Sequence, residues 1–304
     1  MNKIIVIVGP TAIGKTELAI NIAQVFNGEI INADSMQVYR QMEIGTAKPS
    51  KQEFNKVPHH LFNIVDIKDS FSVADFQKQI KKVTSKIIAD NKLPIIVGGT
   101  GLYIKAFLFN YEFEKFEARS GDEKYQDKTN EELYDLLLKV DIETSKKIHA
   151  NNRKRLIRAL DIYYNNKTSK STLEKNQALI PTYDAIIIGL TMEREHLYQR
   201  INQRVDLMFE KGLEKEAKEI INNAAQNSTA LQAIGYKEFI PYINGLVSLE
   251  STKDIIKQNT RNYAKRQYTY FNNQLKVKWF NIEETKTESI IEYINQKLVE
   301  DTDE

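Results

Sequence analysis

The stretch GPTAIGKT, residues 9–16, directly follows the apolar run KIIVIV of residues 3–8 and decides the fold class. It fits the pattern G-x-x-x-x-G-K-[ST], in which glycines let backbone N–H groups surround a phosphate and the lysine reaches its outer oxygens. The run before it is typical of a buried parallel strand, and ELAINIAQV after it has helical spacing. Strand, loop and helix therefore occur in the order of a P-loop. The predicted phosphate-binding residues are Gly9, Pro10, Thr11, Ala12, Ile13, Gly14, Lys15 and Thr16.

Strands and helices continue to alternate after this loop. Apolar runs predict strands at residues 29–32 and 93–97, and residues 71–90 read as an amphipathic helix with Ser72 as its N-cap. This alternation predicts an α/β fold, a P-loop NTPase-like doubly wound parallel sheet. Residues 110–183 have helical but no strand patterns, and the strand pattern returns at 184–192. We therefore predict a discontinuous core, residues 1–109 and 184–304, with a helix-rich C-terminal part, and a helical insertion domain, residues 110–183.

Composition limits the class of protein. The chain has 304 residues, of which 41% are hydrophobic and 28% charged, and no apolar stretch approaches the about 18–20 residues that span a bilayer. Cysteine is absent, which excludes disulfides and cysteine-ligated zinc. We expect a cytoplasmic monomer with no membrane segment and no signal peptide. The net charge of +2 is unevenly distributed, because residues 255–282 contain six basic residues and no acidic one.

A phosphate loop alone leaves the reaction open, because kinases, ATPases and enzymes that handle a diphosphate share it. The strand at 93–97 ends in GGTG, residues 98–101, rather than in the acid of a Walker-B motif, and Thr100 offers a hydroxyl there. A structural turn accounts for GGTG equally well. Asp34 follows the strand at 29–32, where open α/β sheets bind ligands. From its position it can bind a metal, cap a helix or act as a general base, and the amide of Gln37 suits the edge of a nucleobase.

At this point the sequence resembles the tRNA dimethylallyltransferases, also called tRNA isopentenyltransferases. The motifs occur in family order over most of the chain: GPTAIGKT, INADSMQVYRQMEIGTAKP, PHHL, VGGTGLY, KRLIRALDIY, RINQRVDLMFEKGL, QAIGYKE and NTRNYAKRQ. The resemblance implies transfer of a dimethylallyl group from dimethylallyl diphosphate to N6 of the adenosine immediately 3′ of certain tRNA anticodons, with Mg²⁺. The phosphate held by the loop is then part of a leaving diphosphate, which fits the missing Walker-B acid.

The resemblance also implies residue roles. Asp34 is the general base, Lys15 and Thr100 assist departure of the diphosphate, Thr16 lies near the magnesium ion, and Arg200 or Arg204 reaches the diphosphate. A surface salt-bridge ladder is the competing interpretation of the two arginines. The residues expected to contact the tRNA anticodon stem-loop are Asp34, Ser35, Met36, Gln37, Thr100, Arg119, Lys154, Arg155, Leu156, Ile157, Arg158, Gln232, Tyr236, Lys237, Arg261, Lys265 and Arg266.

Two basic clusters, at residues 153–158 and 257–278, favour RNA contact over a solvated helix face, because solvated faces normally mix charge signs. Some positions depart from the family pattern. Arg119, with Asp122 as the competing alignment, stands in for an arginine common after VGGTGLY, and Tyr270 and Gln232 replace a tryptophan and a basic residue. Two other enzyme classes stay open, a small-molecule P-loop kinase and a prenyltransferase acting on free AMP. A non-enzymatic RNA-binding GTPase is a more distant alternative.

Overall fold

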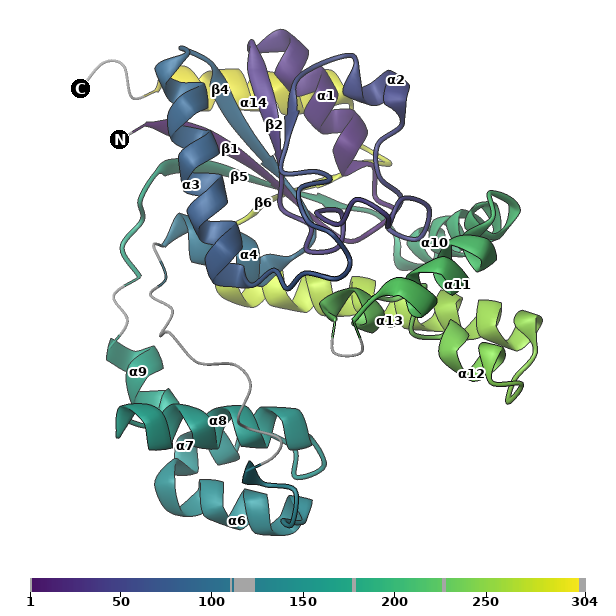
Figure 1. Ribbon diagram of the computed structural model, residues 1–304. Helices are drawn as coiled ribbons and strands as arrows, with labels where there is room; N and C mark the ends of the chain where they lie inside the picture. Colours follow the sequence, from purple (N-terminus) through teal and green to yellow (C-terminus); the bar gives the residue numbers. More distant parts are fainter. Residues whose placement is uncertain (1, 110, 112–123, 177–178, 226–227, 301–304) are drawn as a thin grey trace. The chain divides into compact units, whose positions relative to one another are not determined.

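The computed structural model describes residues 2–109, 111, 124–176, 179–225 and 228–300 (Figure 1). The chain forms two compact units, of which the first joins Met1–Leu108 to Pro181–Glu304 and the second is Phe109–Ile180. These bounds lie close to the domain limits that the sequence predicts at residues 109 and 184. Arg119 and Asp122 lie outside the described residues.

The first unit is built on a six-stranded sheet whose paired strands all run parallel, in the order β3-β2-β4-β1-β5-β6. The central strand β1 pairs with β4 through Ile5 and Ile95 and with β5 through Ile5 and Ile186. The predicted doubly wound parallel sheet is confirmed. The strands are β1 (Lys3–Val8), β2 (Gly28–Asn32), β3 (His59–His60), β4 (Leu93–Val97), β5 (Asp184–Thr191) and β6 (Lys278–Asn281).

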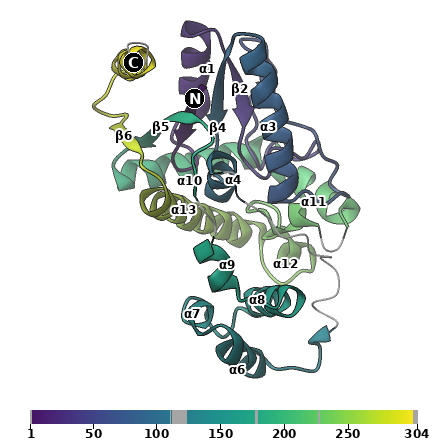
Figure 2. The same cartoon turned by 90° about the vertical axis from the view of Figure 1, so that its left-hand side faces the viewer.

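Helices cover both faces of this sheet, with α1 and α3 on opposite sides (Figure 2). The helices of the first unit are α1 (Lys15–Val25), α2 (Lys51–Phe54), α3 (Val73–Ala89), α4 (Gly101–Leu108), α10 (Arg194–Glu210), α11 (Leu213–Asn223), α12 (Phe239–Ile243), α13 (Leu249–Gln274) and α14 (Thr287–Val299), with a 3₁₀ turn at Thr229–Gln232. None of the helices in the described ranges is long and apolar enough to cross a membrane.

Helix α3 shows why these residues form these elements. The Ser72 side chain accepts a hydrogen bond from the Asp75 N–H, and the Asp75 carboxylate accepts one from the Ser72 N–H, which completes a capping box. Phe76 and Ile80 then turn to the sheet, and Phe76 stacks on Tyr103 of α4 with ring centroids 4.2 Å apart. The strand β3 pairs with Ile30 and Ile31 of β2. It lacks a recognisable strand pattern in the sequence because it has only two residues.

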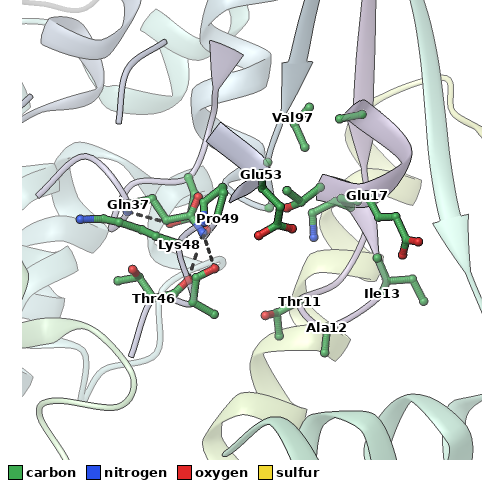
Figure 3. Close-up of a pocket in the computed structure, with 18 of the residues that line it drawn as sticks. Thr11, Ala12, Ile13, Glu17, Gln37, Thr46, Lys48, Pro49, Glu53 and Val97 are labelled. Atoms are coloured by element: carbon green, nitrogen blue, oxygen red, sulfur yellow. Dashed lines mark hydrogen bonds between the residues drawn. The ribbon is translucent and has the colours of Figure 1, made fainter. Parts of the chain in front are cut away.

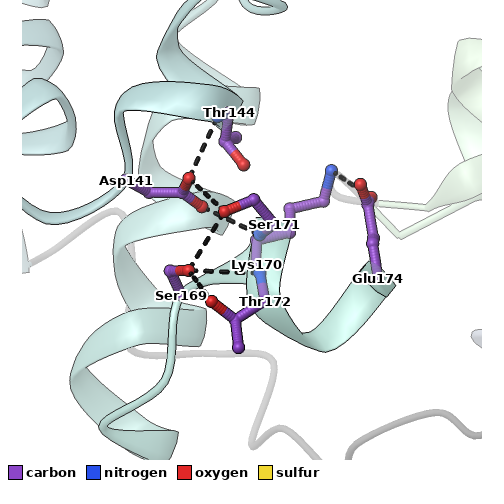
Figure 4. A network of polar contacts seen from close by, with 7 residues as sticks. All are labelled: Asp141, Thr144, Ser169, Lys170, Ser171, Thr172 and Glu174. Carbon is purple, nitrogen blue, oxygen red and sulfur yellow. Dashed lines mark hydrogen bonds and ion pairs between the residues drawn. The ribbon is translucent and has the colours of Figure 1, made fainter. Parts of the chain in front are cut away.

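The second unit contains the helices α6 (Asn130–Val140), α7 (Ile142–Ser145), α8 (Arg153–Asn166) and α9 (Lys170–Asn176). Its small core includes Leu133 and Leu137 of α6 packed with side chains of α8. The buried carboxylate of Asp141 joins two of the short helices (Figure 4). It accepts hydrogen bonds from the Thr144 N–H at 3.0 Å and from the Ser171 N–H at 3.0 Å and hydroxyl at 2.6 Å. Burying this carboxylate is tolerated because it is fully hydrogen-bonded.

Candidate active site

The P-loop, residues 9–16, curls back on itself between β1 and α1. Three of its residues have positive φ angles: Gly9 at 142°, Ala12 at 65° and Gly14 at 99°. The Lys15 ammonium lies inside this curl and donates to the Gly9 carbonyl at 3.1 Å and the Pro10 carbonyl at 2.7 Å. The loop is therefore held in a phosphate-binding shape by its own lysine, with the positive end of α1 beneath it.

Lys15 is electrostatically perturbed. Its pKa is lowered from the ordinary value of 10.5 to about 7, because burial and, second, the nearby Arg204 outweigh the opposing attraction of the Asp34 carboxylate. Burial likewise lowers the pKa of Arg204, again against the attraction of Asp34. Lys15 and Arg204 thus lie close to a single carboxylate, that of Asp34. The excess of positive charge favours binding of an anionic ligand.

Asp34 lies just beyond the carboxyl end of β2, in a turn that it stabilises itself. Its Oδ1 accepts hydrogen bonds from the Met36 N–H at 2.9 Å and the Gln37 N–H at 3.4 Å, and the Asn32 side chain accepts one from the Asp34 N–H at 2.9 Å. No helix begins between Asp34 and Lys51, a segment that is described throughout, so the helix-capping interpretation is wrong and Oδ1 instead holds a turn. Because that oxygen serves the turn, the second carboxylate oxygen is the one suited to receive a proton from a bound molecule.

The glycine loop, residues 98–101 after β4, packs against the Asp34 turn. The Thr100 hydroxyl accepts a hydrogen bond from the Ser35 N–H at 3.0 Å, and the Thr100 N–H donates to the Ala33 carbonyl at 3.3 Å. A Cβ on Gly98 would come 2.2 Å from that same carbonyl, so the close approach requires glycine. The Thr100 hydroxyl is thus hydrogen-bonded to Ser35. The contact of Thr100 with a diphosphate stays a prediction.

A first cavity of about 430 Å³ opens beside the P-loop. Figure 3 shows Thr11, Ala12 and Ile13 on one wall, the segment from Thr46 to Pro49 on the other, and the Glu53 side chain between them. Asp34, Lys15 and Thr16 also line it, as do Arg200 and Arg204 of α10. The five predicted diphosphate contacts with cationic or hydroxyl side chains are thereby brought to one cavity: Thr11, Lys15, Thr16, Arg200 and Arg204.

A second cavity, of about 290 Å³, lies next to the first and is lined mainly by other elements. Among its lining residues are Ser35, Met36, Gln232, Lys237 and Arg266, all predicted to contact RNA. Four residues line both cavities: Thr11, Asp34, Thr46 and Arg204. The cavity beside the P-loop and the second cavity therefore meet at a carboxylate, an arrangement suited to moving a group from one bound molecule to another.

The family model described as IPP transferase matches residues 37–274, more than three-quarters of the chain. The chain belongs to the IPP transferase family. A curated relative from Bacillus cytotoxicus, named tRNA dimethylallyltransferase, is 46% identical over 306 residues, covering 97% of this chain and 96% of the relative. Another with the same name, from Macrococcus caseolyticus, is also 46% identical and covers 99% and 98% of the two chains.

Solved structures extend the IPP transferase comparison. The tRNA delta(2)-isopentenylpyrophosphate transferase of Staphylococcus epidermidis is 42% identical, with a TM-score of 0.73 over 98% of this chain and 99% of that chain. A eukaryotic dimethylallyltransferase acting on tRNA is 30% identical, with a TM-score of 0.82 over 98% of this chain and 80% of that chain. The resemblance read from the motifs is therefore confirmed.

Several predicted RNA-binding residues of this IPP transferase family member have exposed cationic side chains. Lys154, Arg155 and Arg158 are exposed on α8, as are Lys265 and Arg266 on α13. Arg261 is half-buried instead and donates to the Asn202 side chain at 2.6 Å. Lys257, which belongs to the same basic cluster at residues 257–278, pairs with Asp206 at 2.7 Å. The positive charge of this cluster on α13 is thus partly neutralised by Asp206 of α10.

Three predicted RNA contacts are wrong for their side chains. Leu156 and Ile157 are 0% and 5% exposed and belong to the core of the second unit, because they form the apolar face of α8. Tyr236 is fully buried, and its hydroxyl donates to Glu216 at 2.7 Å.

Gln37 lines the first cavity, and its amide nitrogen donates to the Thr46 carbonyl at 3.0 Å.

Two residues of α13 that the sequence did not single out as site residues border the site. The Gln267 side chain contacts both the P-loop and the glycine loop. The Tyr263 hydroxyl contacts the Thr100 and Gln267 side chains, and burial, followed by the negative charge of Asp34, raises the pKa of Tyr263. In the sequence both residues lie within the basic segment, and no local pattern distinguishes them from packing residues.

Proposed function

We propose that this protein transfers a dimethylallyl group from dimethylallyl diphosphate to N6 of the adenosine immediately 3′ of the anticodon, in tRNAs that read codons beginning with U. The products are N6-(dimethylallyl)adenosine and diphosphate. The observation that carries this proposal is the junction of the two cavities at Asp34. Membership in a family whose curated relatives are named tRNA dimethylallyltransferase supports the same reaction.

In this reaction the first cavity holds the donor and the second holds the adenine. The adenine amine is a weak nucleophile because its lone pair is delocalised into the ring, so a base that takes its proton assists attack on the allylic carbon. We assign that role to Asp34, which borders both cavities. As the allylic C–O bond breaks, negative charge grows on the diphosphate. The P-loop amides, Lys15, Arg204 and Arg200 stabilise that charge.

We also propose that Mg²⁺ accompanies the diphosphate. Magnesium favours hard oxygen ligands and usually keeps several waters while binding carboxylates and substrate phosphates. The first cavity offers this chemistry through the Thr16 hydroxyl and the Glu53 carboxylate. Among the described residues there is no cluster of three or more carboxylate or histidine side chains, so the diphosphate oxygens would supply much of the coordination. The ion would neutralise charge on the leaving diphosphate.

For the amine to reach the donor, the target adenosine leaves its stack and enters the second cavity. Gln232, Lys237 and Arg266 at that cavity, with Ser35 and Met36, are the residues proposed to receive it. The exposed cations of α8 and α13 are proposed to hold the anticodon stem-loop through its phosphates. We also propose that the enzyme is a cytoplasmic monomer.

The proposed function is tested by offering labelled dimethylallyl diphosphate in three parallel reactions: with an anticodon stem-loop, with AMP, and without an acceptor. We expect label only in the stem-loop, on the adenosine next to the anticodon. Label in AMP would indicate the free-nucleotide enzyme instead. Phosphoryl transfer from labelled ATP to a metabolite, with no prenylated RNA, would indicate a kinase.

Donor binding should depend on pH through Lys15. Its pKa is about 7 in the free protein, and a bound diphosphate should raise that pKa toward 10.5, because the anion stabilises the ammonium. At pH values above about 7, binding therefore takes up a proton, and affinity falls as the pH rises. Titration calorimetry in two buffers of different ionisation enthalpy measures this uptake. Equal heats in both buffers, or an uptake that persists in Lys15→Ala, would contradict the assignment.

Binding of tRNA should weaken steeply with salt, because bound cations release counterions from the RNA backbone. Replacing Lys154 or Arg155 by alanine should lower the slope of log K against log salt by about one each. Lys146 on the same unit already pairs with Glu143 at 3.2 Å, so Lys146→Ala is the matched control and should leave the slope unchanged. Filter binding over a salt series gives the slopes, and equal slopes in all variants would remove α8 from the RNA interface.

A further inference from the structure

A single side chain of α13 joins the two loops of the site. Gln267 is 4% exposed, and its amide makes two hydrogen bonds in different directions. The Oε1 atom accepts from the Thr11 N–H of the P-loop at 2.9 Å, and the Nε2 atom donates to the Gly99 carbonyl of the glycine loop at 3.0 Å.

The chemistry of these two bonds suits an amide. The P-loop presents a donor and the glycine loop an acceptor, so the bridging group must accept on one side and donate on the other. A glutamate would keep the bond from Thr11 but would set a carboxylate oxygen against the Gly99 carbonyl. Leucine or alanine would leave both backbone groups unpaired in a buried place, which is unfavourable.

Close packing makes the bridge specific. A Cβ built on Gly99 would come 2.0 Å from Gln267 Nε2, and its next neighbour outside Gln267 is the Gly9 carbonyl at 3.8 Å. The missing side chain of Gly99 therefore leaves a space that the Gln267 amide occupies. The glycine loop in turn holds the Asp34 turn, through Thr100 to the Ala33 carbonyl and the Ser35 N–H.

Thr11 and Asp34, at the two ends of this chain of contacts, are among the four residues that line both cavities. We propose that Gln267 is a positioning residue that holds the P-loop and the glycine loop at a fixed spacing and so sets the donor diphosphate relative to Asp34. This inference rests on the proposed function and concerns the same site. Gln267 also lines the first cavity, and in this proposal it acts through Thr11 and Gly99.

The test compares single-turnover and steady-state prenylation by Gln267→Glu and Gln267→Ala with that of the unaltered protein. Because a misplacement of about 1 Å can cost about 100-fold in rate, we expect kcat to fall about 10–100-fold in both variants. The KM for the stem-loop should stay unchanged, because the exposed cations of α13 are untouched. Gln274, on the same helix, is exposed and accepts from Lys105 at 2.7 Å, so Gln274→Ala is the matched control and should keep full kcat.

A second pair of variants separates positioning from general loss of stability. Gly99→Ala should reproduce the fall in kcat, because its methyl group displaces the amide. The double variant Gly99→Ala with Gln267→Ala should be no slower than Gln267→Ala alone, because the displaced group is gone. Losses that multiply in the double variant would overturn the proposal, as would wild-type kcat in the Gln267 variants. Failure of the unaltered protein to prenylate the stem-loop would instead refute the proposed function.

Discussion

Replacing Asp34 by asparagine is expected to lower kcat for prenyl transfer by about 10²–10⁴-fold, the range typical of a lost general base. The amide keeps an oxygen that can accept from the Met36 N–H, so the turn after β2 should persist. It cannot take the proton from the adenine amine. Rapid quench with labelled donor and stem-loop measures the chemical step, and donor binding by titration should stay close to that of the unaltered protein.

Alanine at the same position separates the two roles of Asp34. If the carboxylate served only to cap the turn, Asp34→Asn would be nearly as active as the unaltered protein, and Asp34→Ala alone would be impaired. The general-base role predicts that both variants are severely slowed. Near-normal turnover of Asp34→Asn would therefore remove this residue as the base and leave it as a structural cap.

Replacing Lys15 by alanine is expected to lower kcat by about 10²–10³-fold, corresponding to about 2.7–4 kcal/mol for the loss of one donor to developing negative charge. The ammonium lies in the curl of the P-loop, where the diphosphate would gain charge in the proposed reaction. Its effect should be larger on kcat than on donor affinity, because the stabilisation grows as the bond breaks.

The control for Lys15 is a lysine that lies outside the proposed diphosphate site. Lys92 stands just before β4, at the opposite end of that strand from the glycine loop, and pairs with Glu29 at 2.5 Å. Lys92→Ala should keep its turnover. An equal fall in both variants would indicate a loss of stability, and a Lys15→Ala protein with unaltered kinetics would refute the P-loop as the diphosphate site.

Much of the fold could be predicted because its central elements have strong local patterns. The strands β1 and β4 begin and end at the predicted residues, since their apolar runs are bounded by glycines or charged residues. The N-cap of α3 was predictable from Ser72. The strand β3 could not be predicted, because two residues are too few to show an alternating pattern. It is defined by its pairing with β2.

The site was predictable where function depends on local sequence, and less so where it depends on contacts across the fold. The P-loop and Asp34 follow strands, so their position at the carboxyl edge of the sheet could be inferred. Leu156 and Ile157 lie in a basic motif, yet helical geometry turns them into the core. The bridge made by Gln267 joins residues 168 and 256 positions away in the chain, which no local pattern encodes.

The central claim is that donor and acceptor meet at Asp34 from two adjoining cavities. A crystal structure of the protein with a non-reactive dimethylallyl diphosphate analogue, Mg²⁺ and an anticodon stem-loop tests it most directly. The account predicts the diphosphate in the P-loop, the flipped adenine in the second cavity, and its N6 within hydrogen-bonding distance of Asp34. An adenine bound elsewhere, or a diphosphate outside the P-loop, would contradict it.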